Sequence, residues 1–201
     1  MNKLDEMGLT ENTIVVFMSD NGHSIEVDYK IKVKDHSSGL PFGHSYAASG
    51  AGYTGKWVGH KGNFKEGGVR VPAIIRYPKK LKGGMVRDQA ITACDIMPTI
   101  MDLCHISRPK GMVLDGKSLV SIIQENVETH HKVMHWGWQN KWMVRRGDWK
   151  LIMQDRKGKK LELYNLADEL PEQTNYINSK PELAQELKTL HEKWIKEVSM
   201  K

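Results

Sequence analysis

The consecutive residues Asp20 and Asn21 are the clearest candidates in this sequence for binding a metal ion. They come one residue after the apolar run Ile14–Met18 and are followed by Gly22. A carboxylate and an amide carbonyl are hard oxygen donors, which suit Ca²⁺ or Mg²⁺ better than a thiophilic metal. Gly22 would let the backbone turn away, with a positive φ if the turn needs one. The alternative is an ordinary Asp-Asn-Gly turn after a strand.

A second candidate site lies around two lysines, Lys61 and Lys65, which precede a predicted Gly67-Gly68 turn. A lysine held near a metal ion could bind an anionic group as a point charge. Either lysine could equally be a solvated surface residue.

A long glycine-rich connection, His36–His60, precedes these lysines and carries histidine and aromatic residues. Structureless loops of this length are uncommon in compact domains unless they have a function, so this loop could line a substrate pocket. The alternative is a poorly ordered insertion.

Two predicted strands and a helix would position these residues. The unbroken apolar run Ile14–Met18 is typical of a strand buried on both faces of a parallel sheet, and Ala73–Tyr77 is a second short strand. Ligands collect beyond the carboxyl ends of strands in open α/β sheets, which is where Asp20 would lie. Thr92 and Asp95 predict a capping box for a helix that reaches Leu103.

The periodicity changes from His131 onward. Short apolar-rich segments separated by tight turns predict an antiparallel meander of four strands: 131–138, 141–146, 149–154 and 161–166. The segment Pro181–Val198 predicts an amphipathic helix that covers one side of the meander. Its predicted buried face consists of Leu183, Leu187, Leu190, Trp194 and Ile195.

Composition excludes several classes of protein. No apolar run is long enough for a membrane span, and Met1–Thr10 lacks the apolar region of a signal peptide. Cys94 and Cys104 do not make a disulfide framework, and their apolar surroundings predict buried free thiols. The net charge of +6 is concentrated in Lys141–Lys160, which indicates an anionic partner or a solvated basic hairpin. No nucleic-acid-binding motif accompanies it, so we expect no nucleic acid partner.

Together these motifs resemble the sulfatase family, of the arylsulfatase type in the alkaline-phosphatase-like superfamily. The resemblance is carried by residues 19–22, 61–72, 95–99, 114–118, 142–151 and 163–166, which include Ser-Asp-Asn-Gly and Glu-Gly-Gly-Val-Arg-Val-Pro. It implies an α/β fold: a partial alkaline-phosphatase-like sheet with helices, followed by a small antiparallel sheet packed on a C-terminal helix. Residues 1–127 would be the carboxy-terminal part of the catalytic α/β domain, and residues 128–201 a small C-terminal subdomain.

The resemblance also implies roles for individual residues. Asp20 and Asn21 match two ligands of a divalent cation, usually calcium, and Lys61 matches a lysine that contacts the substrate's sulfate group. His23, His36, His44 and His60 are pocket candidates, with structural roles as the alternative, and His23 is the one we expect to bind substrate. The implied substrate is a sulfate ester, and a sulfated sugar would suit the basic and aromatic segments.

Sulfatases use a formylglycine made from the first residue of a Cys/Ser-x-Pro-x-Arg motif, and this chain has no such motif. Cys104 and Arg108 have the right spacing, but Ile106 takes the place of the proline. We therefore expect the formylglycine in a missing amino-terminal half, which would act as a partner. The chain alone would be inactive, and its partial sheet would expose an edge and an apolar face.

Two other functions stay open. One is a phosphodiesterase or phosphonate hydrolase of the same superfamily, and the other is a non-catalytic module that binds sulfated polymers. A periplasmic or secreted location is expected if a full-length form exists.

Overall fold

The computed structural model describes residues 1–23, 54–155 and 160–199, which form two compact units. Unit 1 consists of Met1–Asp20 and Pro72–Lys132, and unit 2 of Asn21–Val71 and Val133–Lys201. The division of the chain into domains at residue 127 stays a prediction. Within the described ranges, no helix has the length and apolarity that crossing a bilayer requires.

Unit 1 begins with helix α1 (Asn2–Glu6), a 3₁₀ helix (Thr10–Asn12) and strand β1 (Val15–Met18). After strand β2 (Ala73–Arg76) come a 3₁₀ helix (Ala93–Asp95), helix α3 (Ile96–Leu103) and helix α4 (Val120–Glu125). The apolar core of this unit is a small cluster built on Tyr77, Leu81 and Leu103.

Strand β1 pairs with β2 in an antiparallel two-stranded sheet. The cross-strand pair Phe17 and Ile74 is 68% and 61% exposed. The prediction that β1 is buried on both faces of a parallel sheet is therefore wrong for the described part of the chain. The physical reason is that the core cluster packs against Ile14 and Ile75 on one face of this sheet, whereas Phe17 and Ile74 on the other face stay exposed in the described part of the chain.

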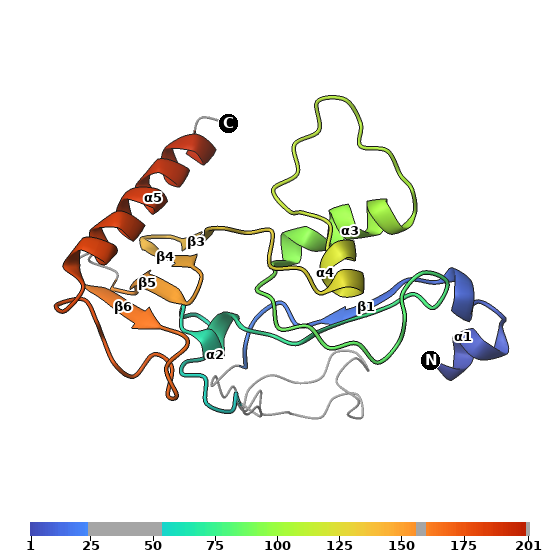
Figure 1. The fold of residues 1–201 in the computed structure, drawn as a ribbon, viewed down its shortest axis with the longest axis horizontal. Helices are drawn as coiled ribbons and strands as arrows, with labels where there is room; N and C mark the ends of the chain where they lie inside the picture. Colours follow the sequence, from blue (N-terminus) through green and yellow to red (C-terminus); the bar gives the residue numbers. More distant parts are fainter. Residues whose placement is uncertain (24–53, 156–159, 200–201) are drawn as a thin grey trace, which may run out of the picture. The chain divides into compact units, whose positions relative to one another are not determined.

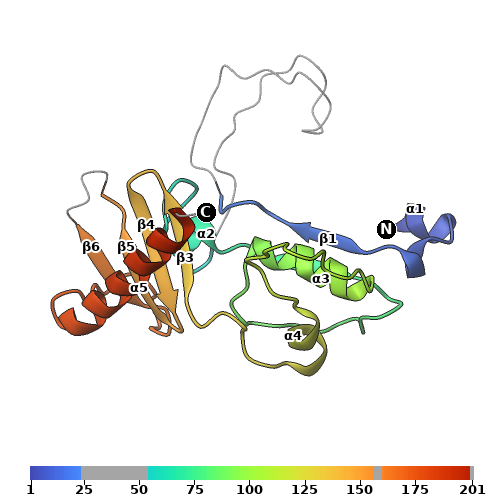
Figure 2. The ribbon, with the colours of Figure 1, turned by 90° about the horizontal axis from the view of Figure 1, so that it is seen from above.

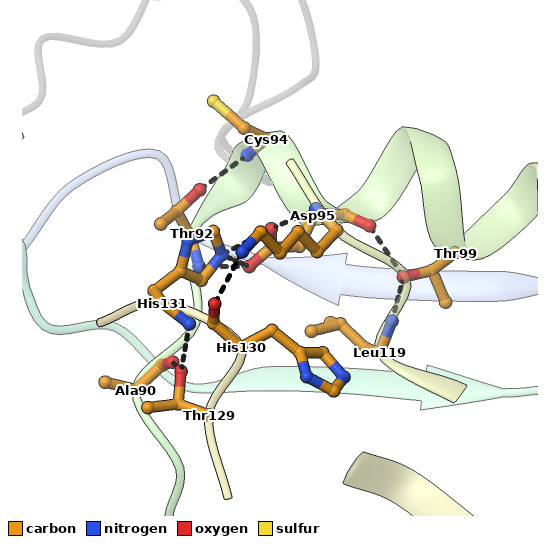
Figure 3. Close-up of polar contacts among 10 residues, drawn as sticks. Ala90, Thr92, Cys94, Asp95, Thr99, Leu119, Thr129, His130 and His131 are labelled. Carbon is orange, nitrogen blue, oxygen red and sulfur yellow. Dashed lines mark hydrogen bonds and ion pairs between the residues drawn. The ribbon is translucent and has the colours of Figure 1, made fainter. Parts of the chain in front are cut away.

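Asp95 joins the segments of unit 1 through its fully buried carboxylate (Figure 3). Oδ2 accepts the backbone N–H of Thr92 at 2.8 Å, and Oδ1 accepts that of Lys117 at 2.8 Å. The ring Nε2 of His131 lies 2.8 Å from Oδ1. The capping box predicted from Thr92 and Asp95 is confirmed. Because this carboxylate already meets three donor groups, we interpret the Asp95–His131 pair as a structural connection.

Thr99 extends this connection to the start of α4. Its Oγ1 donates to the backbone oxygen of Asp95 at 2.6 Å and accepts the N–H of Leu119 at 2.9 Å (Figure 3). Pro98 lies in the first turn of α3, where its missing N–H costs no helical hydrogen bond, and the preceding turn is 3₁₀.

Both cysteines are exposed, so the prediction of buried thiols is wrong. Cys104 follows Leu103, which is 3% exposed. Adjacent residues of a helix point about 100° apart, so an apolar neighbour in sequence does not bury the next side chain.

Unit 2 contains helix α2 (Glu66–Val69) and a four-stranded sheet with the predicted meander order. Its strands are β3 (Met134–Trp138), β4 (Lys141–Arg146), β5 (Trp149–Met153) and β6 (Leu161–Asn165). Helix α5 (Pro181–Ser199) lies across this sheet, as Figures 1 and 2 show. The predicted antiparallel meander and its covering helix are confirmed.

Alternation along the strands buries both faces of this sheet. Val144, Leu151 and Leu163 pack against α5, whereas Met143, Ile152 and Tyr164 form a second cluster on the opposite face. That second cluster receives Phe64 and Val69, which flank or belong to α2. The sheet thus connects α5 to the segment that carries the candidate lysines.

An aromatic cluster fixes α5 near its C-terminal end. The ring of His191 stacks on Trp142 with centroids 4.3 Å apart, and that of His135 stacks on Trp194 at 5.0 Å. His191 is 3% exposed, whereas Ile195, predicted on the buried face, is 40% exposed. The Nδ1 atoms of both histidines are buried and have no hydrogen-bond partner within the described ranges. Such an environment disfavours the charged imidazolium.

This cluster predicts that acid destabilises unit 2. Burial, and secondarily His135, lowers the pKa of His191 from 6.5 to about 4, and burial lowers the pKa of His135 as well. Because the folded pKa lies below the unfolded one, the stability is present above about pH 6.5 and is lost as the pH falls toward 4. For His191 alone, we expect a loss of about 2 kcal/mol between about pH 7.5 and about pH 5.

Urea unfolding of the chain at several pH values measures this loss. His191→Phe keeps a ring against Trp142 but cannot be protonated, so it should flatten the pH dependence. An equally steep pH dependence in that variant would assign the acid sensitivity to other groups.

Candidate functional site

The predicted metal-binding pair follows β1. Asp20 is exposed, and Asn21 is half-buried. The side-chain Nδ2 of Asn21 donates to the backbone oxygen of Gly22 at 2.9 Å, which fixes the orientation of the amide. Oxygen is the atom through which an amide ligates a hard cation, so the donor set of Asp20 and Asn21 fits Ca²⁺.

These two residues supply only part of a coordination shell. Ca²⁺ takes about six to eight oxygen ligands. Among the described residues there is no group of three or more His, Cys, Asp or Glu side chains that could hold a metal ion. A complete site built on Asp20 and Asn21 therefore needs further ligands.

Two main-chain hydrogen bonds join the turn after β1 to the segment with the candidate lysines. The N–H of Gly22 donates to the oxygen of Gly68 at 2.9 Å, and the N–H of Lys61 donates to the oxygen of His23 at 2.8 Å. The structure thus brings together Asn21, His23 and Lys61, which are candidates from two separate stretches of sequence.

Close packing explains the glycine of the turn. A Cβ atom on Gly22 would lie 1.8 Å from the backbone oxygen of Gly67, so no side chain fits. Gly22 is not among the residues with positive φ, so its expected role in a left-handed turn is replaced by this close approach. Gly67 and Gly68, predicted as a turn, instead belong to α2, and a Cβ on either would lie 2.4 Å from a backbone oxygen.

Of the four candidate histidines, the structure describes His23 and His60. His23 is half-buried, and its Nδ1 has no hydrogen-bond partner in the described part of the chain. Nδ1 of His60 lies 2.8 Å from the backbone oxygen of Lys61, which indicates a structural role in the lysine turn. His36 and His44 lie outside the described residues.

The C-terminal sheet supports the turn that carries Lys61, an exposed lysine. The backbone N–H of Phe64 donates to Oε1 of Gln154 at 3.0 Å, just after β5. Nε2 of Gln154 and Nζ of Lys141 both approach the backbone oxygen of Gly62, at 3.5 and 3.4 Å. Sequence analysis missed these contacts, because nothing in the sequence links Gln154 to residues about ninety positions earlier.

The basic stretch Lys141–Lys160 is not simply a solvated hairpin. Lys150 is fully buried between Glu66 and Glu172, and Arg146 forms a two-pronged ion pair with Glu186 on α5. At least two of these basic side chains therefore form ion pairs within unit 2. Residues 156–159 of this stretch lie outside the described residues.

Comparison with known proteins gives a consistent picture. Residues 1–106 match the family model described as sulfatase. Residues 56–200 match the model described as N-sulphoglucosamine sulphohydrolase, C-terminal. Together the two models span nearly the whole chain, and they overlap across the lysine segment and α2.

Individual relatives agree with these matches. An uncharacterized sulfatase of Schizosaccharomyces pombe is 30% identical over 92% of this chain and 38% of that protein. Human steryl-sulfatase is 31% identical over 62% of this chain and 19% of that protein. The chain thus spans well under half the length of these relatives.

A solved structure in complex with its substrate, D-glucosamine-2-N,6-O-disulfate, has a TM-score of 0.64 and 23% identity. The match covers 97% of this chain and 36% of that one. This likeness confirms the expected fold class, a partial α/β sulfatase fold with a small antiparallel sheet.

Proposed function

This chain belongs to the sulfatase family, and we propose that it contributes metal ligands and a sulfate-binding lysine to the hydrolysis of a sulfate ester. The observation that carries the proposal is the pair of main-chain hydrogen bonds, Gly22 to Gly68 and Lys61 to His23. They hold the turn of Asn21 beside the turn of Lys61. A metal ion and a lysine that act on the same sulfate group require such an arrangement.

Each side chain has a distinct part in this proposal. Asp20 and Asn21 would hold a divalent cation, which we propose to be Ca²⁺. When bound, such a cation offsets negative charge on a sulfate group. The ammonium group of Lys61 would bind the sulfate as a point charge. His23, whose backbone oxygen accepts the Lys61 N–H, would be a substrate-binding residue.

The nucleophile would come from outside this chain. The 201 residues contain no Cys/Ser-x-Pro-x-Arg motif. We therefore propose that a formylglycine and the remaining metal ligands are supplied by a further amino-terminal part, in a periplasmic or secreted enzyme.

We propose a sulfated sugar as the substrate class. A structural relative has D-glucosamine-2-N,6-O-disulfate as its substrate. In this chain, the guanidinium of Arg70 lies 3.9 Å from the ring centre of Trp57, and Lys141 approaches the turn of Lys61. Cationic and aromatic groups on the segment that carries the lysine suit a sugar that carries negative charge.

A chimaera tests the proposal. In it, this chain replaces the corresponding C-terminal segment of the Schizosaccharomyces pombe sulfatase, and turnover of 4-nitrophenyl sulfate is measured with added Ca²⁺. We expect turnover by the chimaera and none by the chain alone. Lys61→Ala should lower turnover about 10²- to 10³-fold, since it removes a charge that stabilises the transition state.

Lys79→Ala, at an exposed lysine after β2, is the matched control and should keep full turnover. Asp20→Ala should raise the Ca²⁺ concentration needed for half-maximal turnover. Equal turnover by the Lys61 and Lys79 variants would contradict the role of Lys61. Tight binding of heparin by the chain, without turnover in any chimaera, would favour a non-catalytic module.

A further inference from the structure

Lys150 is an unusual residue in unit 2, because its ammonium group is fully buried. It lies in β5, and its Nζ donates to Oε1 of Glu66 at 2.7 Å and to Oε1 of Glu172 at 3.0 Å. A buried lysine is costly unless acceptors surround it. Two carboxylates from segments 84 and 22 residues away satisfy that requirement here.

Glu66, at the start of α2, is fixed from several directions. Its backbone N–H donates to Oε2 of Glu172 at 2.7 Å, so a distant carboxylate caps the helix, which has no cap of its own. Its Oε2 accepts from Nε of Arg70 at 2.6 Å, and Arg145 lies 3.9 Å away. A helix of four residues cannot persist without such outside contacts.

The basic residues of this cluster favour the ionised form of Glu66. Burial acts to raise the pKa of Glu66, but Lys150 and Arg70 hold it below its usual value. Burial, with the Glu66 charge adding to it, raises the pKa of Glu172 despite Lys150. An ionised Glu66 keeps its strong hydrogen bonds to both basic residues.

The fixed end of α2 is connected directly to the candidate site. The N–H of Gly67 donates to the oxygen of Val58 at 2.7 Å, and the oxygen of Gly68 accepts from Gly22 at 2.9 Å. Phe64 and Val69 pack against the apolar cluster on one face of the sheet. Apolar contact stabilises this packing but does not specify the orientation of α2. The ion cluster does specify the orientation of α2, because ammonium and carboxylate groups form hydrogen bonds only in particular geometries.

We propose that Lys150 and Glu172 are positioning residues, which hold α2 and thereby the turns of Lys61 and Asn21. The importance of these two turns for catalysis rests on the proposed function. The structural content of the inference, that the C-terminal sheet orders these two turns through one buried ion cluster, stands independently.

Amide hydrogen exchange on the full 201-residue chain tests this proposal. In Lys150→Met, the amides of Lys61, Gly67 and Gly68 should exchange at least about tenfold faster, while those of β4 and β5 keep their protection. Arg146→Met is the matched control. It breaks an ion pair between the same sheet and α5, and it should leave the Lys61 turn unchanged.

Variants of Glu172 separate positioning from general stability. Glu172→Ala should mimic Lys150→Met. Glu172→Gln keeps an acceptor for the Glu66 N–H but presents an NH₂ group to Lys150, so it should restore part of the protection. Unchanged exchange at Lys61 and Gly68 in both Lys150→Met and Glu172→Ala would overturn the proposal. Loss of protection throughout β4 and β5 would also overturn it, since the cluster would then be a general folding core. Exchange is read without turnover, so an inactive chimaera would refute the proposed function and leave this inference intact.

Discussion

Replacing Asp95 with alanine is expected to destabilise unit 1 by at least about 3 kcal/mol. The substitution removes the carboxylate that accepts from Thr92 and Lys117 and contacts His131. Because this region is buried, water cannot replace the lost acceptor fully, and each stranded donor costs about 1–3 kcal/mol. The capping box of the 3₁₀ helix Ala93–Asp95 is lost in the same step.

Urea unfolding of the full chain, together with amide exchange at Leu119, measures this effect. Asp95→Asn keeps one oxygen but presents an NH₂ group to a donor, so an intermediate loss is expected. Asp88→Ala, at an exposed aspartate of the same unit, is the control and should change stability by less than about 0.5 kcal/mol. An Asp95→Ala variant as stable as the control would refute the structural role of this carboxylate.

Replacing Gly22 with alanine should separate the turn after β1 from α2. The new Cβ would lie 1.8 Å from the backbone oxygen of Gly67 and 3.0 Å from Cα of Gly68, and backbone atoms cannot rotate away as a flexible side chain can. The hydrogen bond between Gly22 and Gly68 should therefore break, at a cost of about 3 kcal/mol. The bond between Lys61 and His23 should weaken with it.

Amide protection of Lys61 and a Ca²⁺ titration of the chimaera report this separation. We expect faster exchange at Lys61 and a weaker response to Ca²⁺, because Asn21 no longer keeps its position beside the lysine turn. Gly137→Ala is the control, since a Cβ there meets no atom within 4 Å. If Gly22→Ala behaves like Gly137→Ala, then close packing does not explain this glycine.

Local patterns predicted much of unit 2 correctly. Alternating apolar residues and tight turns gave the four strands of the meander to within a few residues, and Pro181 marked the start of α5. The capping box of Thr92 and Asp95 was equally accurate. These features depend on neighbours within a few positions, so the sequence contains all the information that they require.

The candidate site residues were predicted from the sequence motif, and their catalytic and metal-binding roles stay predictions. The structure adds that the turns carrying Asn21 and Lys61 are hydrogen-bonded to each other. It also corrects the environment of β1, because the same apolar pattern suits a strand in a parallel sheet and one in an antiparallel pair with an exposed face.

Sequence patterns alone were enough to predict the strands of the meander, the long C-terminal helix, the helix cap at Thr92 and the resemblance to sulfatases. The folded chain was needed to show that Lys150 is buried, that Glu172 caps α2 and that Gly22 must lack a side chain. A lysine in a basic stretch has the same sequence pattern whether it is solvated or buried. Its environment depends on carboxylates distant in sequence, which only folding brings within hydrogen-bonding distance.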